Sequence, residues 1–566
     1  MEDEKEIQKA QDITGKAYKE NKPSGNKKIY IWLPLCIAVS IAVGIFIGNA
    51  FSIFNNTRGW FGGKNKLDLI FDYVGKAYVD TVNINDMIEE AIPSVLMGLD
   101  PHSDYIPANI MEQRGSELDG HFSGIGVEFL ILNDTLTIVN AVQGGPSEAV
   151  GIQSGDRVVS VNDTLFSGKQ LDENKVFSTL KGPKGTKIKL DIRRTGQKGL
   201  IPFVITRADV PVKSVDAAYM LDDKNGYIKI SKFGGNTFNE FIAAIAKLKS
   251  LGCTSFVVDL QQNSGGYLEA ALLMTNEFLS NGDLIVYTEG RTSPRENYFA
   301  DNTGTCKTNQ LVVLVDEGSA SSSEIFAGAI QDNDRGLIVG RRSFGKGLVQ
   351  APYRFKDGSE LRLTIARYYT VSGRSIQKAY ERGNRDDYNL DLYNRYSRGE
   401  FDNKDSIKFD NLPLFHTLGG RPVYGNDGIL ADIFVPRDTA GVNSYYIRVA
   451  NRLLREYAYV FTENNRTKLN SFKTWQEMAK FLTNQPLVDN FVEYAYSKGI
   501  RRQPYLIEEA RRLMANQLEA FIVRNFFGDD GFYPLFQRDD KVILEGLKLL
   551  KANKAIPENI RKGSYK

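Results

Sequence analysis

The 566-residue sequence predicts a multidomain protein of mixed α/β and α+β class. An N-terminal transmembrane helix is followed by a small helical region, a β-rich module, an α/β core and a C-terminal helical extension. Three observations predict this order. Residues 29–50 are almost wholly apolar and carry no charge. Within residues 209–440, short runs rich in β-branched residues alternate with segments of helical periodicity, as in α/β folds. Beyond residue 443, apolar residues recur at three- and four-residue steps, which indicates helices.

The apolar run at residues 29–50 is long enough to cross the hydrocarbon core of a bilayer. Lys27 and Lys28 precede it directly, and only Arg58 follows closely. The positive-inside rule therefore predicts that residues 1–28 are cytoplasmic and that the rest of the chain lies outside the cytoplasm. A cleaved signal peptide is the alternative, less favoured because the polar leader is long and the run spans a full membrane thickness.

Residues 64–115 form the predicted small helical region, which follows a spacer rich in glycine and asparagine. Apolar residues between positions 67 and 99 follow a helical period. The region contains the run Leu99, Asp100, Pro101, His102 and Ser103, in which we expect the histidine to be structural.

A separate β-rich module is predicted at residues 116–208. Its first strand carries Gly124, Ile125, Gly126 and Val127, and a second strand covers residues 136–142. Further signals are a short helix of small residues and a Gly-x-x-x-Gly-Asp turn, present as Gly145, Pro146, Ser147, Gly151, Gly155 and Asp156.

These elements, in this order, resemble a PDZ domain. The resemblance implies that the loop of Gly124, Ile125, Gly126 and Val127 offers backbone amides to the terminal carboxylate of a peptide, which adds a strand to the sheet edge. Apolar neighbours such as Ile125, Val127 and Phe129 would accept an apolar last side chain.

One serine lies at a predicted strand-to-helix turn, a position that can support nucleophilic catalysis. An apolar β-branched run at residues 311–316 predicts a buried strand, and residues 323–330 predict a helix, so Ser321 lies where the strand meets the helix. Exposed amides and the positive end of the helix dipole at such a turn can stabilise an oxyanion. In the extended segment at residues 345–350, Lys346 and Gln350 fall on one face.

Lysine is the base that this region offers. The only histidines are His102, His121 and His416, and none lies near the serine, although sequence distance alone does not exclude a Ser/His/Asp triad. A lysine can serve if burial lowers its pKa toward neutrality. For Ser321 alone, an ordinary helix N-cap is the favoured interpretation, with Lys346 a surface lysine. Ser321 and Lys346 taken together, with their flanking residues, favour a catalytic pair instead.

Together these segments resemble the carboxyl-terminal processing proteases, also called tail-specific proteases. The matching motifs are residues 318–324, which read G-S-A-S-S-S-E, then Gln331 with Asp332, and residues 344–350, which read F-G-K-G-L-V-Q. The resemblance implies that Ser321 is the nucleophile, Lys346 the general base and Gln350 its orienting partner. Asp332 lies about 16 Å along a helix from Ser321, at about 1.5 Å per residue, and is expected to be structural.

A third matching segment, residues 259–266, follows an apolar strand. The resemblance implies that the amides of Gly266 and Ser322 form the oxyanion hole. Gln261 stands where the family usually has arginine, and an amide does not replace the charged, planar arginine fork. Near the end of the core, Ala431 occupies a position where the family typically has proline.

Composition excludes several classes of function. The formal net charge is +2, so no nucleic-acid-binding stripe is indicated. Cys36 lies in the apolar run, whereas Cys253 and Cys306 could pair outside the cytoplasm. No cluster of histidine, cysteine and carboxylates has metal-binding spacing, and no cofactor motif is present, so neither a metal nor a cofactor is predicted.

Two regions have less specific sequence patterns. Residues 380–411 are polar, charged and rich in tyrosine, which predicts an insertion or a flexible loop. Residues 441–566 form a predicted helical domain whose apolar stripes are most simply core. Homodimerisation or adaptor docking through the helical regions is left open.

The predicted function is that of a membrane-anchored bacterial serine endopeptidase of the inner membrane, with its catalytic part periplasmic or otherwise extracytoplasmic. Its PDZ domain would recognise protein tails with apolar carboxyl termini, and the Ser321/Lys346 pair would cut near them through an acyl-enzyme. One alternative is a catalytically silent PDZ scaffold. The other is a serine/lysine hydrolase of cell-wall peptides or β-lactams, which lacks the expected S-x-x-K spacing.

Overall fold

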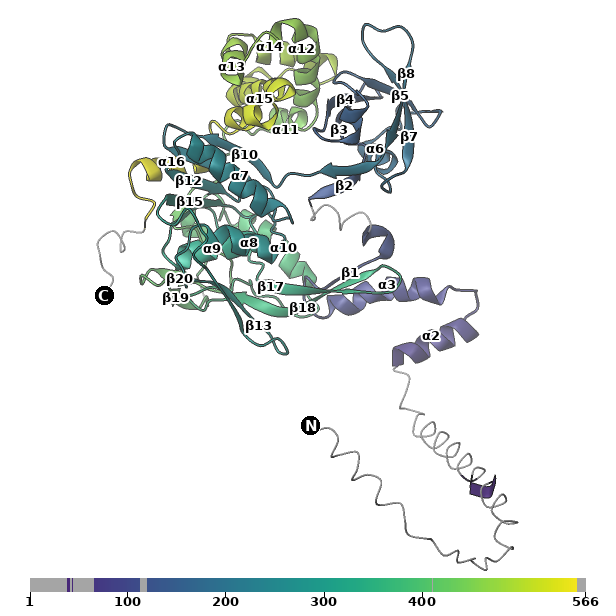
Figure 1. Cartoon of the computed structure of the whole chain (residues 1–566), viewed down its shortest axis with the longest axis vertical. Helices are drawn as coiled ribbons and strands as arrows, with labels where there is room; N and C mark the ends of the chain where they lie inside the picture. The colour runs from purple at the N-terminus through teal and green to yellow at the C-terminus, as the bar shows by residue number, and fades with distance from the viewer. Residues whose placement is uncertain (1–37, 41–42, 44–65, 112–119, 410, 557–566) are drawn as a thin grey trace, which may run out of the picture. The chain divides into compact units, whose positions relative to one another are not determined.

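A computed structural model describes residues 38–40, 43, 66–111, 120–409 and 411–556 (Figure 1). The predicted membrane span at residues 29–50 lies almost entirely outside these ranges. Among the residues that are described, no helix combines the length and apolarity needed to cross a bilayer. The chain divides into two compact units, residues 1–90 and 91–566.

The described part of the predicted helical region includes helices α2 (Lys66–Ala77) and α3 (Ile84–Met97), and residues 108–111 are also helical. Helix α2 belongs to the first unit, has no buried residues and carries an exposed ion pair between Lys76 and Asp72. Helix α3 has Pro93 in its interior and buries only Leu96. The helical period of this region therefore predicts its secondary structure correctly.

The β-rich module is built on one antiparallel sheet in the order β3-β4-β5-β7-β8, with β6 (Thr164–Leu165) paired to β5. The main strands are β3 (Val127–Leu132), β4 (Thr135–Ala141), β5 (Arg157–Val161), β7 (Lys187–Arg193) and β8 (Ile201–Thr206). Helices α5 (Pro146–Ala149) and α6 (Glu173–Leu180) accompany the sheet, and β2 (His121–Gly124) pairs with β9 (Ala208–Pro211). Within the described residues, strand β3 has a ladder partner on one side only, so its other edge is open to an added strand.

The α/β core contains a six-stranded sheet in the order β10-β11-β12-β15-β16-β21. Strands β10 and β11 are antiparallel, and the remaining pairs are parallel. The bounds are β10 (Val215–Met220), β11 (Asn225–Ile230), β12 (Ser255–Asp259), β15 (Gln310–Val315), β16 (Leu337–Gly340) and β21 (Ile433–Phe434). A parallel sheet needs both faces covered, and helices meet that need here.

The two faces of this sheet pack against different helices. Phe256 and Val258 of β12 belong to the cluster formed with α7 (Thr237–Ser250), α8 (Leu268–Asn276) and α9 (Ser322–Asp332). Val257, between them, belongs to the opposite cluster, which includes Val542 and Ile543 of α16 (Lys541–Lys551). This alternation is the period-two pattern of a strand buried on both sides. Figure 1 shows α16, in yellow, beside β12 and β15.

A second, antiparallel sheet includes the strand that directly follows the predicted Lys346 segment. Its order is β1-β18-β13-β14, with β17 also paired to β18. The strands are β1 (Asp104–Ile106), β13 (Leu284–Glu289), β14 (Glu296–Phe299), β17 (Leu348–Arg354) and β18 (Glu360–Tyr369). The short strands β19 (Leu414–His416) and β20 (Pro422–Tyr424) form a separate hairpin.

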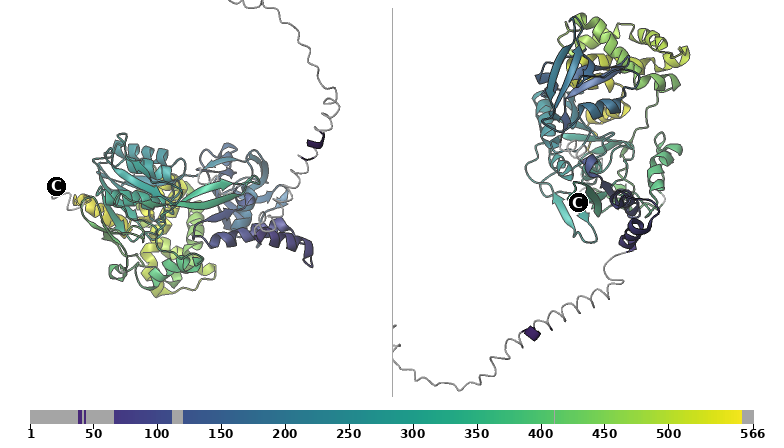
Figure 2. Two further views of the ribbon diagram at one scale, coloured as in Figure 1. Left: turned by 90° about the horizontal axis from the view of Figure 1, so that it is seen from below. Right: turned by 90° about the vertical axis from the view of Figure 1, so that its right-hand side faces the viewer.

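The C-terminal region is helical, as predicted. Its helices are α11 (Ser444–Ala450), α12 (Leu453–Leu469), α13 (Trp475–Thr483), α14 (Leu487–Ser497), α15 (Pro504–Phe536) and α16. Helices α11 to α15 share one apolar core and form the light green and yellow bundle in Figure 2. Helix α15 is interrupted at Gly528, whose φ of +56° is not helical.

The structure corrects one expectation, for residues 380–411, and decides a question that the sequence left open, the pairing of Cys253 with Cys306. Helix α10 (Arg385–Ser397) occupies much of this region, so it is not a flexible loop, and Tyr388 and Arg395 of α10 are buried. Cys253 and Cys306, whose pairing the sequence left open, do not form a disulfide, because both are buried free cysteines.

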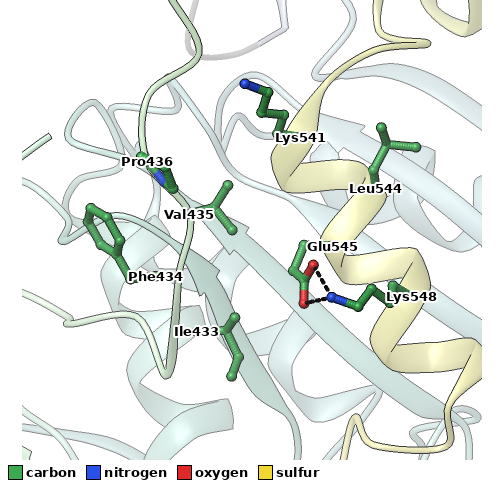
Figure 3. Close-up of a pocket in the computed structure, with 8 residues that line it drawn as sticks. All are labelled: Ile433, Phe434, Val435, Pro436, Lys541, Leu544, Glu545 and Lys548. Atoms are coloured by element: carbon green, nitrogen blue, oxygen red, sulfur yellow. Dashed lines mark hydrogen bonds and ion pairs between the residues drawn. The ribbon is translucent and has the colours of Figure 1, made fainter. Parts of the chain in front are cut away.

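A pocket of about 530 Å³ lies between β21 and α16 (Figure 3). Its lining residues are Ile433, Phe434, Val435, Pro436, Lys541, Leu544, Glu545 and Lys548. Lys548 and Glu545 form an ion pair at 2.9 Å. None of the residues predicted to carry chemistry lines this pocket, so the candidate site is elsewhere.

Candidate active site

Ser321 occupies the turn between β15 and α9 and is the N-cap residue of α9. Its backbone is strained, with a φ of +56° and a ψ of −115°. A non-glycine residue there costs about 1–3 kcal/mol and persists only where the surroundings enforce it. Strain of this kind is concentrated at functional sites, so the conformation marks Ser321 among the serines of its motif.

The glycine loop packs directly against this serine. A Cβ atom on Gly265 would lie 2.7 Å from the Cβ of Ser321 and 2.8 Å from the carbonyl oxygen of Ala320. A Cβ atom on Gly266 would meet the carbonyl oxygen of Phe233 at 2.0 Å. Only glycine therefore allows the loop after β12 to approach the nucleophile turn this closely.

Glu324 joins the serine segment to the lysine segment. Its Oε2 accepts hydrogen bonds from the backbone N–H groups of Ser321, at 2.9 Å, and Lys346, at 2.8 Å. Its Oε1 accepts from the hydroxyl of Ser343, at 2.5 Å, and the N–H of Gly345, at 2.7 Å. Burial raises the pKa of Glu324 to about 7, although the four donors favour the carboxylate. One buried carboxyl group thus sets the separation of the two predicted catalytic backbones.

Lys346 precedes β17, and its Nζ donates to Oε1 of Gln350 at 3.3 Å. Burial lowers the pKa of Lys346, and the positive charge of Arg362 lowers it further, whereas Glu324 and Asp100 act in the opposite direction. Both lowering effects favour the neutral amine that a general base requires.

No hydrogen bond joins the Ser321 hydroxyl to the Lys346 amine in the part of the chain that the structure describes. Catalytic hydrogen bonds are often long in structures without substrate, so this geometry is compatible with a dyad that tightens on binding. The structure brings the backbones of Ser321 and Lys346 together, because the N–H group of each donates to Glu324.

Gln350 connects the lysine to a segment remote in sequence. While its Oε1 accepts from Lys346, its Nε2 donates to the backbone carbonyl oxygen of His102. The His102 ring contacts the hydroxyl of Tyr388 at 2.7 Å. The expectation that Gln350 lies beside Lys346 agrees with this contact, and His102 has the structural surroundings expected for it.

The predicted oxyanion donors lie close to each other. The hydroxyl of Ser322 donates to the carbonyl oxygen of Gly266 at 2.9 Å, which fixes the glycine loop against the start of α9. The amides of Gly266 and Ser322 have no hydrogen-bond acceptor within the described part of the chain. Two unpaired amides beside a strained serine can donate to an oxyanion.

The loop at residues 259–266 has Gln261 where the family usually has arginine, but Lys229 supplies a positive charge nearby. Lys229 donates to the carbonyl oxygen of Gln261 at 2.6 Å and forms an ion pair with Asp259 at 3.3 Å. The backbone N–H of Gln261 also donates to Asp259, and the hydroxyl of Tyr227 donates to the same carboxylate at 2.5 Å. Asp259 therefore keeps a positive partner although position 261 carries no charge.

Asp332 lies at the far end of α9 from Ser321. It pairs with the buried Arg374 at 2.8 Å and accepts from the hydroxyl of Ser372 at 2.7 Å. These contacts agree with the structural role expected for it.

The predicted carboxylate-binding loop joins β2 to β3. Within the described residues, the amides of Ile125 and Gly126 have no acceptor, and Gly126 has a φ of +70°. The expectation that the Ile125 side chain accepts a peptide side chain is wrong, because it is 1% exposed and belongs to the module's core. Phe129 packs instead against the half-exposed Phe177 of α6, with ring centroids 5.3 Å apart.

Sequence reasoning missed the roles of Glu324 and Tyr388. The spacing of Ser321 and Glu324 is that of a capping box, which indicates that the Ser321 N–H donates to the Glu324 carboxylate. It gives no sign of the bonds to Gly345 and Lys346. No local signal connects Tyr388 to His102, because 286 residues separate them.

Family models match three parts of the chain. Residues 224–389 match peptidase family S41, and residues 137–194 match the PDZ domain. Residues 445–528 match a family of unknown function (DUF8443). The module, the core and the serine turn therefore define a serine-type peptidase with a PDZ domain.

Two relatives identify the family more closely. The carboxy-terminal-processing protease of Bartonella bacilliformis is 35% identical over 328 residues, which are 57% of this chain and 74% of the relative. The carboxy-terminal processing protease CtpA of Bacillus subtilis is 30% identical over 354 residues, with coverages of 62% and 75%. Among solved structures, a photosystem II D1 C-terminal processing protease aligns with 65% of this chain and 91% of its own, at 22% identity and a TM-score of 0.34. The chain belongs to the carboxy-terminal processing proteases of peptidase family S41.

Proposed function

We propose that this protein is a membrane-anchored serine endopeptidase that recognises carboxyl-terminal tails of extracytoplasmic proteins and cleaves near them with a Ser321/Lys346 dyad. The observation that carries the proposal is the shared contact of both residues with Glu324, combined with the lowered pKa of Lys346. A partly buried lysine, joined through Glu324 to the backbone of a strained serine, is what an amine base for a hydroxyl nucleophile needs.

The proposed reaction has two stages. The neutral amine of Lys346 takes the proton of the Ser321 hydroxyl as Oγ attacks the scissile carbonyl, and the amides of Gly266 and Ser322 donate to the oxyanion. The Lys346 ammonium then protonates the departing amine, which leaves an acyl-enzyme on Ser321. Lys346 next takes a proton from the water that attacks the ester and passes it to Oγ as the ester bond breaks, which releases the carboxylic acid and restores both residues.

The dyad is tested with the full-length chain in detergent and a disordered protein that ends in an apolar residue. Ser321→Ala and Lys346→Ala should each abolish cleavage, and the exposed Lys356→Ala, close in sequence, should not. Cleavage that persists in Ser321→Ala would show that the nucleophile is wrongly assigned.

The PDZ domain is proposed to receive the tail, either to deliver it or to release a block on the site. Support comes from the amides of Ile125 and Gly126, which have no acceptor among the residues that the structure describes, and from the adjacent edge of β3, which has no ladder partner among them. Gly126→Val should abolish binding of a peptide with an apolar carboxyl terminus. The control Gly196→Val has a similar positive φ, in the β7–β8 turn and with no atom within 4 Å of a Cβ, and should leave binding intact. Equal affinities in both variants would exclude this loop as the receptor.

A catalytically silent scaffold remains the alternative to cleavage. Gln261 favours this alternative because it lacks the charge of the arginine usual in the family, but Lys229 supplies a positive charge to the same loop through its contacts with Gln261 and Asp259. Tail binding without any cleavage by the wild-type chain, even after tail addition, would favour the scaffold.

A further inference from the structure

Helix α10 contacts the backbone just before the turn that carries Lys346. The buried guanidinium of Arg395 donates to the carbonyl oxygens of Ser343, at 2.9 Å, and Arg342, at 2.7 Å. Glu400 pairs with both Arg395, at 2.9 Å, and Arg342, at 2.7 Å. The helix is therefore fixed to the backbone just before the Phe344-Gly345-Lys346 turn.

The same helix also contacts the segment that carries His102. Arg385 donates to the carbonyl oxygen of Ser103 at 2.7 Å. The hydroxyl of Tyr388, which is 5% exposed, contacts Nε2 of His102 at 2.7 Å, with the two rings edge to face. Helix α10 thus bridges two segments that are more than 200 residues apart in the sequence and that meet at Gln350.

These contacts form a continuous chain to the proposed base. Tyr388 contacts the His102 ring, the His102 carbonyl accepts from Gln350, and Gln350 accepts from Lys346. We propose that Tyr388 is a positioning residue for Lys346, which acts through His102 and Gln350 and makes helix α10 part of the catalytic apparatus. The inference deepens the proposed function and rests on Lys346 being the base.

A lysine base needs such support because its four-carbon side chain is flexible and a misplacement of about 1 Å can cost about 10²-fold in rate. Gln350 is the only side chain to which Nζ of Lys346 donates within the described residues. The position of Gln350 depends in turn on the His102 carbonyl. Asp100 holds the His102 segment on one side, through the His102 N–H at 2.8 Å, and Tyr388 holds it on the other.

The His102 ring and the Tyr388 hydroxyl, which support Gln350, each keep one protonation state. Burial and the nearby charge of Lys346 lower the pKa of His102 to about 3, so the ring stays neutral in the working range. Burial raises the pKa of Tyr388, so its hydroxyl keeps its proton. The contact between them is therefore a hydrogen bond of neutral groups, and Gln377 adds a weaker one to the same hydroxyl at 3.4 Å.

Tyr388→Phe tests the proposal, because it keeps the ring packing and removes only the hydroxyl. In the full-length chain, with a quenched fluorescent peptide that ends in an apolar residue, kcat should fall by about tenfold or more while KM stays within about twofold. Labelling of Ser321 by a fluorophosphonate should slow by a similar factor. The control Tyr393→Phe lies on the same helix, is 64% exposed and should match the wild type.

A double-mutant cycle separates positioning from general stability. If Tyr388 acts through Gln350, the variant that combines Tyr388→Phe with Gln350→Ala should be no slower than Gln350→Ala alone. Additive losses would show that Tyr388 acts by another route. If Tyr388→Phe is unstable, His102→Ala removes the same hydrogen bond from the other side and should give the same fall in kcat.

The positioning role of Tyr388 and the proposed Ser321/Lys346 dyad are contradicted by different results. A wild-type kcat and labelling rate in Tyr388→Phe, with Lys346→Ala inactive, would overturn the positioning role and keep the dyad. Full activity in Lys346→Ala would overturn the proposed function itself.

Discussion

Ser321 and Lys346 lie on separate segments, yet one buried side chain, Glu324, fixes their backbones through a single oxygen atom. A second tie supports it, since the Phe344 N–H donates to the carbonyl oxygen of Ser319 at 2.9 Å. At the scale of single residues, the geometry of the site is therefore a matter of backbone positions as much as of the two side chains.

Glu324→Gln should lower kcat by about 10- to 100-fold, because an amide NH₂ group would face backbone N–H groups that now donate to a carboxylate. Steady-state cleavage of the quenched peptide measures the loss. Glu269→Gln, an exposed residue in the first turn of α8, is the matched control and should change nothing. An unchanged kcat in Glu324→Gln would remove Glu324 from this account.

Arg362→Gln should move the acidic limb of the pH profile of kcat/KM to higher pH. Arg362 lowers the pKa of Lys346, so its removal raises that pKa and the neutral amine forms only at higher pH. Activity should fall near neutrality and recover at the alkaline plateau. Arg354→Gln is the control, since Arg354 pairs with the same Glu360 but is not among the charges that shift the pKa of Lys346. Identical profiles would contradict the electrostatic role.

Motifs in the sequence predicted where Ser321, Lys346, Gln350, Gly266 and Ser322 would lie. They did not predict that Glu324 has four donors, because these come from two segments that only the fold brings together. They also assigned Ile125 to a binding surface, since an apolar residue beside a glycine gives no sign of which way its side chain points.

At the scale of elements, α16 completes the core of the protease sheet although it lies at the end of the helical extension. Its buried residues Val542, Ile543, Leu549 and Leu550 pack with Val257 of β12 and with β15. The apolar period of the extension predicted a helix here, but it carried no information about its partner. The alternation of strands and helices was predictable because a buried parallel sheet demands it.

Ile543→Ala should lower the free energy of unfolding by about 2–5 kcal/mol, because this 2% exposed side chain fills the space between α16 and the sheet. Urea unfolding measures the change. The neighbouring Leu544 is 48% exposed, so Leu544→Ala should change stability by no more than about 0.5 kcal/mol. Equal losses would show that α16 does not pack as described.

Helix α10 is the element that the sequence predicted least well. Its polar and aromatic composition favoured a loop or an insertion, because Arg395 and Tyr388 are residue types usually at least partly exposed. Their burial depends on partners from other segments, the Ser343 carbonyl and the His102 ring. A local pattern cannot reveal such partners.

At the scale of the whole molecule, the order of regions read from the sequence agrees with the elements of the structure from α2 to α16. The membrane anchor rests on residues 29–50 and the basic residues before them, and it remains a prediction. The full-length chain should sediment with membranes and resist alkaline carbonate, whereas a variant that lacks residues 29–50 should be released. Release of both forms would contradict the anchor.

The central claim is that Lys346 activates Ser321. The most direct test is the rate at which a fluorophosphonate labels the full-length chain, with the modified residue located by peptide mass spectrometry. The account predicts one adduct, on Ser321, formed at least about 10²-fold more slowly in Lys346→Ala. An adduct on another serine, or an equal rate in both chains, would contradict it.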